Sequence, residues 1–173
     1  LNPFGVTLYQ GELDPANPAC DTTAAGCDYR VDDGTLDPET CEPIVSLEAT
    51  RTGSTVRAGG PGTVISLDVP LGEGSLSLIL YNVQLVGTVT EDAGGDITAF
   101  DGVLGGAVFK SDILTALESL PPDTLPIDAG GIAPLLEALV TDDIDVDGDG
   151  SPDAASIGIP VTGVGGTITG IIE

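Results

Sequence analysis

From residue 44 onward, apolar and polar residues alternate along the chain with the period of two that is typical of half-buried strands. Residues 45–50 carry this alternation. So do residues 64–69 and 75–80, which flank the turn-forming sequence Gly72-Glu73-Gly74 and are therefore expected to form a hairpin. At Tyr81-Asn82 the apolar positions slip by one residue, so we expect a bulge or bend there.

More strands are expected nearer the end of the chain. The sequence "EDAGGD" at 91–96 is typical of a turn and leads into a strand that begins at Ile97. Residues 155–161 and 166–172 again combine β-branched residues with alternation. Glycines inside several of these segments indicate close backbone approaches or bulges.

Two short helices are expected between residues 111 and 140. Ser111 is the expected N-cap of the first, with Asp112 at the positive end of the helix dipole and Pro121 at its end, and Pro134 lies near the first turn of the second. The apolar faces comprise Ile113, Leu114, Leu117 and Leu120 in the first helix and Ile132, Leu135, Leu136, Leu139 and Val140 in the second. We expect both faces to pack against the sheet.

The expected fold is therefore mainly β with two short helices: an antiparallel β-sandwich or curled sheet, the helices closing one end and the last strand returning beside an earlier one. Residues 1–42 are rich in Asp, Pro and Gly, and we expect a loop-rich, cysteine-containing N-terminal extension with one extended piece at Phe4–Tyr9. Residues 43–173 are expected to form a single β-rich domain, because 173 residues with 41% hydrophobic content suffice for one core.

Charge narrows the range of partners. The chain has 28 acidic and 4 basic residues and a formal net charge of -24, so it offers no basic patch for nucleic acid or an anionic bilayer. No window is long and apolar enough for a transmembrane segment. Adaptation to high salt would also explain this acidity, and composition alone does not separate that explanation from a requirement for divalent cations.

Cys20, Cys27 and Cys41 lie in the stretch with the fewest apolar residues, where an exported protein would use a disulfide to hold the chain. A bridge from Cys20 to Cys27 or from Cys27 to Cys41 would close a short loop, and the odd count leaves one thiol over. Zinc is not expected, because the spacing is too wide for a common zinc site and the chain has no histidine. These features favour an extracellular or cell-surface location.

The sequence "DDIDVDGDGSPD" at 142–153 places six carboxylates within twelve residues, and such a segment needs either open water or a cation. With Asp145 as position 1, Asp147, Asp149, Gly150, Ser151 and Asp153 occupy positions 3, 5, 6, 7 and 9. This pattern resembles the calcium loops of EF-hands, dockerins and thrombospondin type 3 repeats, and the resemblance implies bound calcium.

The resemblance implies a loop at 143–153 with the ligands Asp143, Asp145, Asp147, Asp149, Ser151 and Asp153. It departs from the EF-hand at position 12, where Ser156 stands in place of the bidentate Glu, so the missing ligand would come from Asp143, from water or from elsewhere in the fold. A solvated acidic linker is the alternative. A second ion held by Asp28, Asp32, Asp33 and Asp37 is disfavoured, because their spacing fits no defined loop.

The chain contains no histidine, which excludes Ser-His-Asp and Cys-His catalysis and leaves a carboxylate-based hydrolase as the remaining enzyme class. With 28 acidic residues some carboxylates lie close together in any case, so their proximity is no evidence of such a hydrolase, and we expect no enzyme.

The whole chain is loosely similar to secreted or lipid-anchored proteins of Gram-negative bacteria with no characterised activity. The expected function is a calcium-stabilised extracellular structural protein that self-associates in a surface assembly or fibre, with "FGVTLY" pairing with a neighbour. The alternative is a monomeric secreted or lipid-anchored module that binds carbohydrate or a surface protein.

Overall fold

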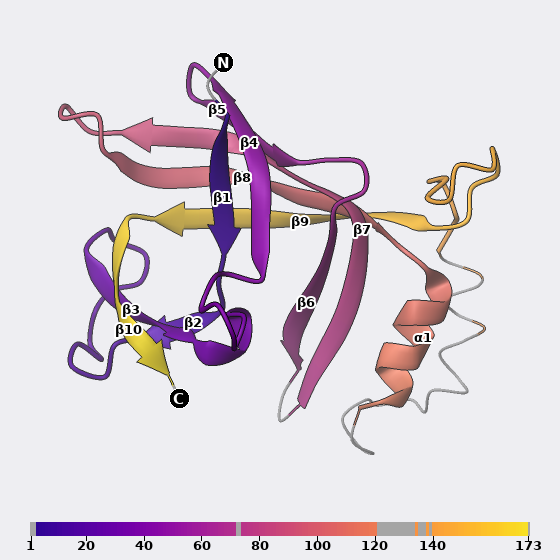
Figure 1. The fold of residues 1–173 in the computed structure, drawn as a ribbon, viewed down its shortest axis with the longest axis horizontal. Helices are drawn as coiled ribbons and strands as arrows, with labels where there is room; N and C mark the ends of the chain where they lie inside the picture. The colour runs from indigo at the N-terminus through magenta and orange to yellow at the C-terminus, as the bar shows by residue number, and fades with distance from the viewer. Residues whose placement is uncertain (1–2, 72–73, 121–133, 135–137, 139, 173) are drawn as a thin grey trace. The chain divides into compact units, whose positions relative to one another are not determined.

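The computed structural model describes residues 3–71, 74–120, 134, 138 and 140–172. The strands are β1 (Phe4–Leu8), β2 (Gly11–Leu13), β3 (Cys27–Asp32), β4 (Val45–Thr52), β5 (Thr55–Gly59), β6 (Val64–Leu71), β7 (Gly74–Glu91), β8 (Ile97–Val108), β9 (Ala155–Val164) and β10 (Gly166–Ile172). One 3-10 helix (η1, Asp33–Thr35) and one α-helix (α1, Lys110–Glu118) complete the elements of the described residues (Figure 1).

The prediction of a mainly β fold is confirmed. The strands form a seven-stranded sheet with the order β1-β4-β5-β7-β8-β9, in which β6 also pairs with β7, and a three-stranded sheet with the order β10-β3-β2. A sandwich arrangement and helices closing one end stay predictions. The second predicted helix lies mostly on residues outside the described part of the chain.

The chain divides into two compact units. Unit 1 comprises Leu1–Gly59, Leu85–Leu104 and Pro160–Glu173, and unit 2 comprises Gly60–Gln84 and Gly105–Ile159. None of the helices in the described part of the chain combines the length and apolar character that crossing a bilayer requires.

In unit 1, β1 pairs antiparallel with β4, and β4 pairs antiparallel with β5 (Figure 1). The alternation predicted for residues 45–50 is visible in the burial of β4, where Leu47 and Ala49 are 2% exposed and their neighbours face solvent. The predicted close backbone approach occurs at Gly102, where a Cβ would lie 2.5 Å from the carbonyl oxygen of Val86. A residue larger than glycine at position 102 would therefore force strands β7 and β8 apart.

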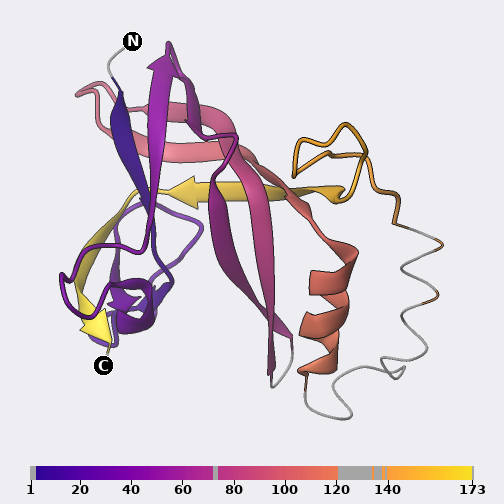
Figure 2. The same cartoon turned by 45° about the vertical axis from the view of Figure 1, so that its right-hand side comes forward.

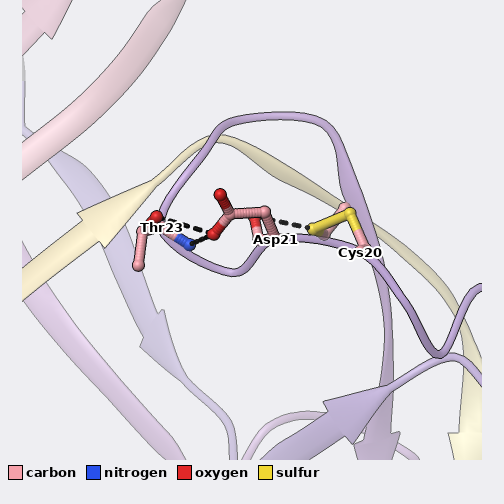
Figure 3. Close-up of a disulfide and its surroundings, with 4 residues drawn as sticks. Cys20, Asp21 and Thr23 are labelled. Carbon is pink, nitrogen blue, oxygen red and sulfur yellow. Dashed lines mark hydrogen bonds between the residues drawn. A yellow bond between two sulfur atoms is a disulfide. The ribbon is translucent and has the colours of Figure 1, made fainter.

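The N-terminal extension contains more strand than the sequence indicated. Besides β1 it forms β2 and β3, and β3 pairs antiparallel with β2 and parallel with β10. In Figure 2 the yellow C-terminal strand lies beside the purple N-terminal segment. The last strand thus returns beside an earlier one, as expected. Cys27 begins β3 and is fully buried, and its disulfide to Cys20 confirms one of the two predicted bridges (Figure 3). Cys41 is a free, exposed thiol.

In unit 2, the predicted hairpin is confirmed as β6 and β7, which pair antiparallel from Val64 opposite Tyr81 to Leu71 opposite Gly74. The predicted bend at residues 81–82 is also confirmed. Asn82 has a φ of 51° and its side chain accepts a hydrogen bond of 2.8 Å from the Gly62 N–H. The buried positions accordingly change phase from Leu80 to Val83, both fully buried.

Helix α1 confirms the first predicted helix, but not its cap. It begins at Lys110, so Phe109 is the N-cap and Ser111 lies inside the first turn. Phe109 makes no side-chain capping bond and instead packs its ring edge-on against Tyr81 at a centroid distance of 4.8 Å. An aromatic contact therefore fixes the helix start at a place where the sequence favours a hydroxyl cap.

Candidate metal centre

The acidic loop of residues 145–153, in unit 2, is closed at its base by a two-residue antiparallel bridge. Ile144 pairs with Ala154, and the two residues exchange hydrogen bonds of 3.0 and 3.1 Å. Ala154 is fully buried and begins the connection to β9. The loop is therefore attached to the core through its apolar base, while its carboxylates lie at the surface.

Inside the loop, Asp145 receives two backbone hydrogen bonds. The N–H of Gly148 donates to its Oδ1 at 2.7 Å, and the N–H of Gly150 donates to its Oδ2 at 2.8 Å. Both glycines have positive φ values, 80° and 94°, which other residues rarely adopt. The glycines in "DVDGDG" thus allow the backbone to wrap around the Asp145 carboxylate.

Asp147 and Asp149 each close a small turn of the same kind. Asp147 accepts from the N–H of Asp149 at 3.0 Å, and Asp149 accepts from the N–H of Ser151 at 2.7 Å. Carboxylate oxygens of Asp145, Asp147 and Asp149 lie within 4.8 Å of one another. This cluster could hold a metal ion, since oxygen atoms of converging carboxylates are the ligands of hard cations.

The other predicted ligands make different contacts. Asp153 accepts a hydrogen bond of 2.9 Å from the N–H of Val146, across the base of the loop. Asp143 accepts from both the N–H and the hydroxyl of Ser156, at 2.7 and 2.6 Å. The residue at position 12 therefore binds the carboxylate of Asp143, and the cluster itself consists of Asp145, Asp147 and Asp149.

These hydrogen bonds favour the charged carboxylates. The hydrogen bonds from Ser156 lower the pKa of Asp143, and the N–H groups of Gly150 and Gly148 lower the pKa of Asp145. These hydrogen bonds therefore keep both acids ionised to a lower pH than an ordinary aspartate. Ionised oxygens are the form that a cation needs.

Asp142 connects the loop to helix α1. Its Oδ2 lies 3.0 Å from the Nζ of Lys110, and the Lys110 side chain is 17% exposed. Its Oδ1 is buried and has no hydrogen-bond partner among the described residues. This ion pair joins the first residue of the helix to the start of the acidic segment and neutralises one of its six carboxylates.

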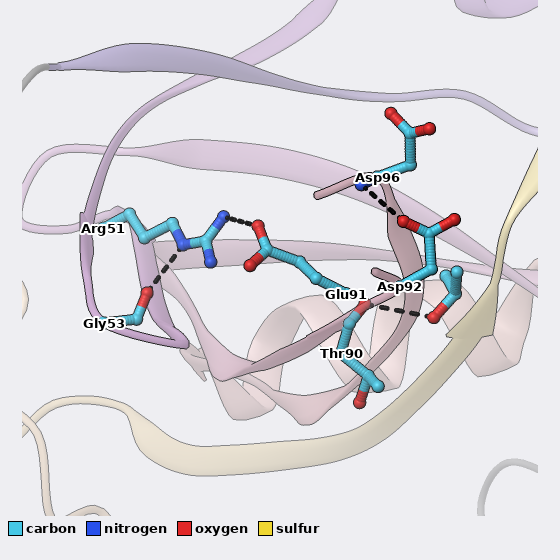
Figure 4. A network of polar contacts seen from close by, with 7 residues as sticks. Arg51, Gly53, Thr90, Glu91, Asp92 and Asp96 are labelled. Atoms are coloured by element: carbon cyan, nitrogen blue, oxygen red, sulfur yellow. Dashed lines mark hydrogen bonds and ion pairs between the residues drawn. The ribbon is translucent and has the colours of Figure 1, made fainter. Parts of the chain in front are cut away.

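The turn at 91–96, in unit 1, shows what an acidic turn looks like without such a cluster. Asp92 accepts hydrogen bonds from the N–H groups of Gly94 and Asp96, at 2.8 and 3.1 Å. Figure 4 shows the bond from Asp96, and it also shows the ion pair of 2.6 Å between Glu91 and Arg51. The local turn chemistry matches that of Asp147 and Asp149. What distinguishes the acidic loop is the convergence of three carboxylates.

Two acidic residues of the N-terminal extension cap local turns. Asp32 caps η1 by accepting from the Gly34 N–H, and Asp37 accepts from the N–H groups of Glu39 and Thr40. Among the described residues, the cluster of Asp145, Asp147 and Asp149 is the group of acidic side chains that could hold a metal ion.

Comparison of the chain with protein-family models, with curated proteins and with solved structures gave no match.

Unit 1 contains a groove of about 560 Å³ that the sequence did not predict. It lies where the chain passes from β1 to β2 and from β9 to β10, and it is lined by Tyr9, Tyr29 and Arg30 among others. A signal for β3 was present, because Cys27, Tyr29 and Val31 alternate with charged residues. The high density of turn residues around it masked this alternation.

Proposed function

We propose that this chain is an extracellular structural protein whose acidic loop binds calcium and thereby holds the segment that leads into strand β9. The observation that carries the proposal is the convergence of the Asp145, Asp147 and Asp149 carboxylates within 4.8 Å. Ionised carboxylates this close repel one another in water, and a divalent cation between them converts that repulsion into attraction.

Calcium suits this loop better than other common cations. The expected ligands are oxygens on flexible side chains, and calcium accepts six to eight oxygens in loose geometry, whereas magnesium requires a near-ideal octahedron. The chain has no histidine and the exposed Cys41 lies in the other unit, so the loop lacks the nitrogen and sulfur ligands that zinc prefers. A site without the position-12 carboxylate belongs in the weak class, with a dissociation constant of about 0.1 to 1 mM.

An extracellular location fits both this affinity and the disulfide. Weak calcium sites fill only where free calcium is millimolar, as it is outside cells. The Cys20–Cys27 bridge closes a loop with a sequence separation of 7 in a segment with few apolar residues, and such bridges persist in oxidising compartments.

Strand β1 supports a structural role in an assembly. It is the first strand in the order of its sheet, so β4 is its one neighbour among the described strands, and its sequence "FGVTL" carries no charge that would discourage pairing with another copy. The contact with a neighbour would use the edge of β1 that faces away from β4.

Light scattering and negative-stain microscopy in millimolar calcium test this role. A subunit of an assembly should form large particles, whereas a monomeric surface module should have a mass near 17.3 kDa. Gly5→Glu adds a charge to β1, where a Cβ would meet nothing closer than 3.8 Å, and it should reduce particle formation. Thr50→Glu is the matched control, because it adds the same charge to β4, which is paired on both sides. Equal assembly of both variants would exclude β1 as the contact.

A further inference from the structure

The groove in unit 1 is formed by both ends of the described chain. Its walls come from β1 and the following Tyr9 and Gln10, from β3, and from the junction of β9 with β10. A volume of about 560 Å³ lies within the range of roughly 300 to 1,000 Å³ that is usual for small-ligand sites. It is too small to receive a folded domain.

The groove contrasts with the rest of this acidic protein. Among the described residues that line it, none is acidic and Arg30 is the one charged residue, although the chain carries 28 acidic residues. The Arg30 guanidinium is engaged, since its Nη2 donates to the Ile171 carbonyl at 2.5 Å. The lining is therefore close to neutral, while the net charge of -24 repels anions at longer range. The net charge disfavours anions and the lack of acidic side chains in the described lining offers no partner to a cation, so together they favour an uncharged ligand.

Two of the three tyrosines of the chain, Tyr9 and Tyr29, line this groove. Tyr9 is 39% exposed, so its ring is accessible to a ligand from the solvent. The ring of Tyr29 lies directly against Gly166, where a Cβ would come within 2.7 Å of its Cε2. Because Gly166 has no side chain, the Tyr29 ring packs closely against it at the wall of the groove.

Polar groups accompany the rings. Within the described part of the chain, the side chains of Thr7, Gln10 and Thr167 form no hydrogen bond, although all three line the groove. An amide and two hydroxyls provide donors and acceptors without charge. Aromatic faces combined with neutral hydrogen-bonding groups match a ligand that has apolar C–H faces and many hydroxyls.

We propose that this groove binds an uncharged oligosaccharide, with the rings of Tyr9 and Tyr29 against the sugar faces and Thr7, Gln10 and Thr167 hydrogen-bonded to its hydroxyls. The site lies in unit 1 and uses none of the residues of the acidic loop, so it stands independently of the calcium proposal.

Isothermal titration calorimetry of the full chain with maltohexaose, cellohexaose, mannohexaose and the charged oligogalacturonate tests the proposal. At least one neutral sugar should bind with a millimolar or tighter dissociation constant. Tyr9→Ala and Gln10→Ala should each weaken it at least about fivefold. Gly166→Ala should weaken it as well, because the added methyl displaces the Tyr29 ring.

Tyr81→Phe is the control, since Tyr81 packs on Phe109 in unit 2 and should leave sugar binding unchanged. Circular dichroism and melting temperature establish that each variant is folded. Binding of none of the neutral sugars, or of oligogalacturonate alone, overturns the proposal. So does sugar binding that survives unchanged in folded Tyr9→Ala and Gly166→Ala proteins.

Discussion

Asp145→Asn should remove most of the calcium-dependent stability of this protein while leaving its fold in place. The substitution takes away one of three carboxylates whose oxygens lie within 4.8 Å, and it keeps one oxygen that can still accept from Gly148 or Gly150. The loss should therefore concern the ion more than the backbone turn.

The size of the effect follows from ligand linkage. For a dissociation constant of about 1 mM, 10 mM free calcium multiplies the folded-to-unfolded ratio by about eleven, which raises the melting temperature of a protein of this length by about 3 to 6 °C. If loss of the carboxylate weakens calcium binding about tenfold, calcium multiplies the folded-to-unfolded ratio by only about two, and the rise in melting temperature falls to about 1 °C.

Melting scans in EDTA and in calcium measure both shifts, with sodium chloride at matched ionic strength as the reference for general screening. Asp92→Asn is the control variant: it removes the same charge from an acidic turn with similar backbone bonds but no carboxylate cluster, and it should keep the full shift. A wild-type shift that sodium chloride reproduces would refute the calcium site and favour adaptation to salt. An equal calcium shift in Asp145→Asn would exclude this cluster as the site.

Three further outcomes are expected. Leu80→Ala should destabilise the protein by about 2 to 5 kcal/mol in urea unfolding, because the side chain is fully buried; a smaller loss would contradict this packing. Replacing Cys20 and Cys27 by Ser should cost about 2.5 kcal/mol from loop-closure entropy, measured by denaturant unfolding of wild type and variant, and an unchanged midpoint would argue against the bridge. The pKa of Asp143 is lowered by its bonds to Ser156, so their stabilisation is complete above about pH 4 and is lost as pH falls through the lower folded value. Ser156→Ala should thus melt below wild type at neutral pH and converge with it in acid, and a constant difference across the pH range would contradict the linkage.

Much of the fold was predictable because the deciding signals are local. The alternation in β4 and β6, the hairpin pairing of β6 with β7, and the phase slip before Asn82 each depend on neighbouring residues, and each is confirmed. The predicted start of α1 was wrong by two residues, because the N-cap is Phe109 and not Ser111, and Phe109 is held by a ring contact with Tyr81, which lies far away in the sequence.

The candidate site was predictable in part for the same reason. Alternating aspartates with glycines at 148 and 150 predict a loop whose carboxylates converge, and three of them do. The role of Asp143 was not predictable, because the sequence does not reveal that Ser156 would occupy both of its oxygens.

The sequence by itself determined an acidic, mainly β protein with a carboxylate-rich turn. Charge, the two-residue alternation of apolar and polar positions, and turn chemistry are all properties of short segments. The tertiary structure alone decided that β10 pairs parallel with β3, and that Tyr9 and Tyr29 share a groove with Gly166. The physical reason is that contacts between residues more than a hundred positions apart depend on how the whole chain closes, which the pattern of a short segment does not encode.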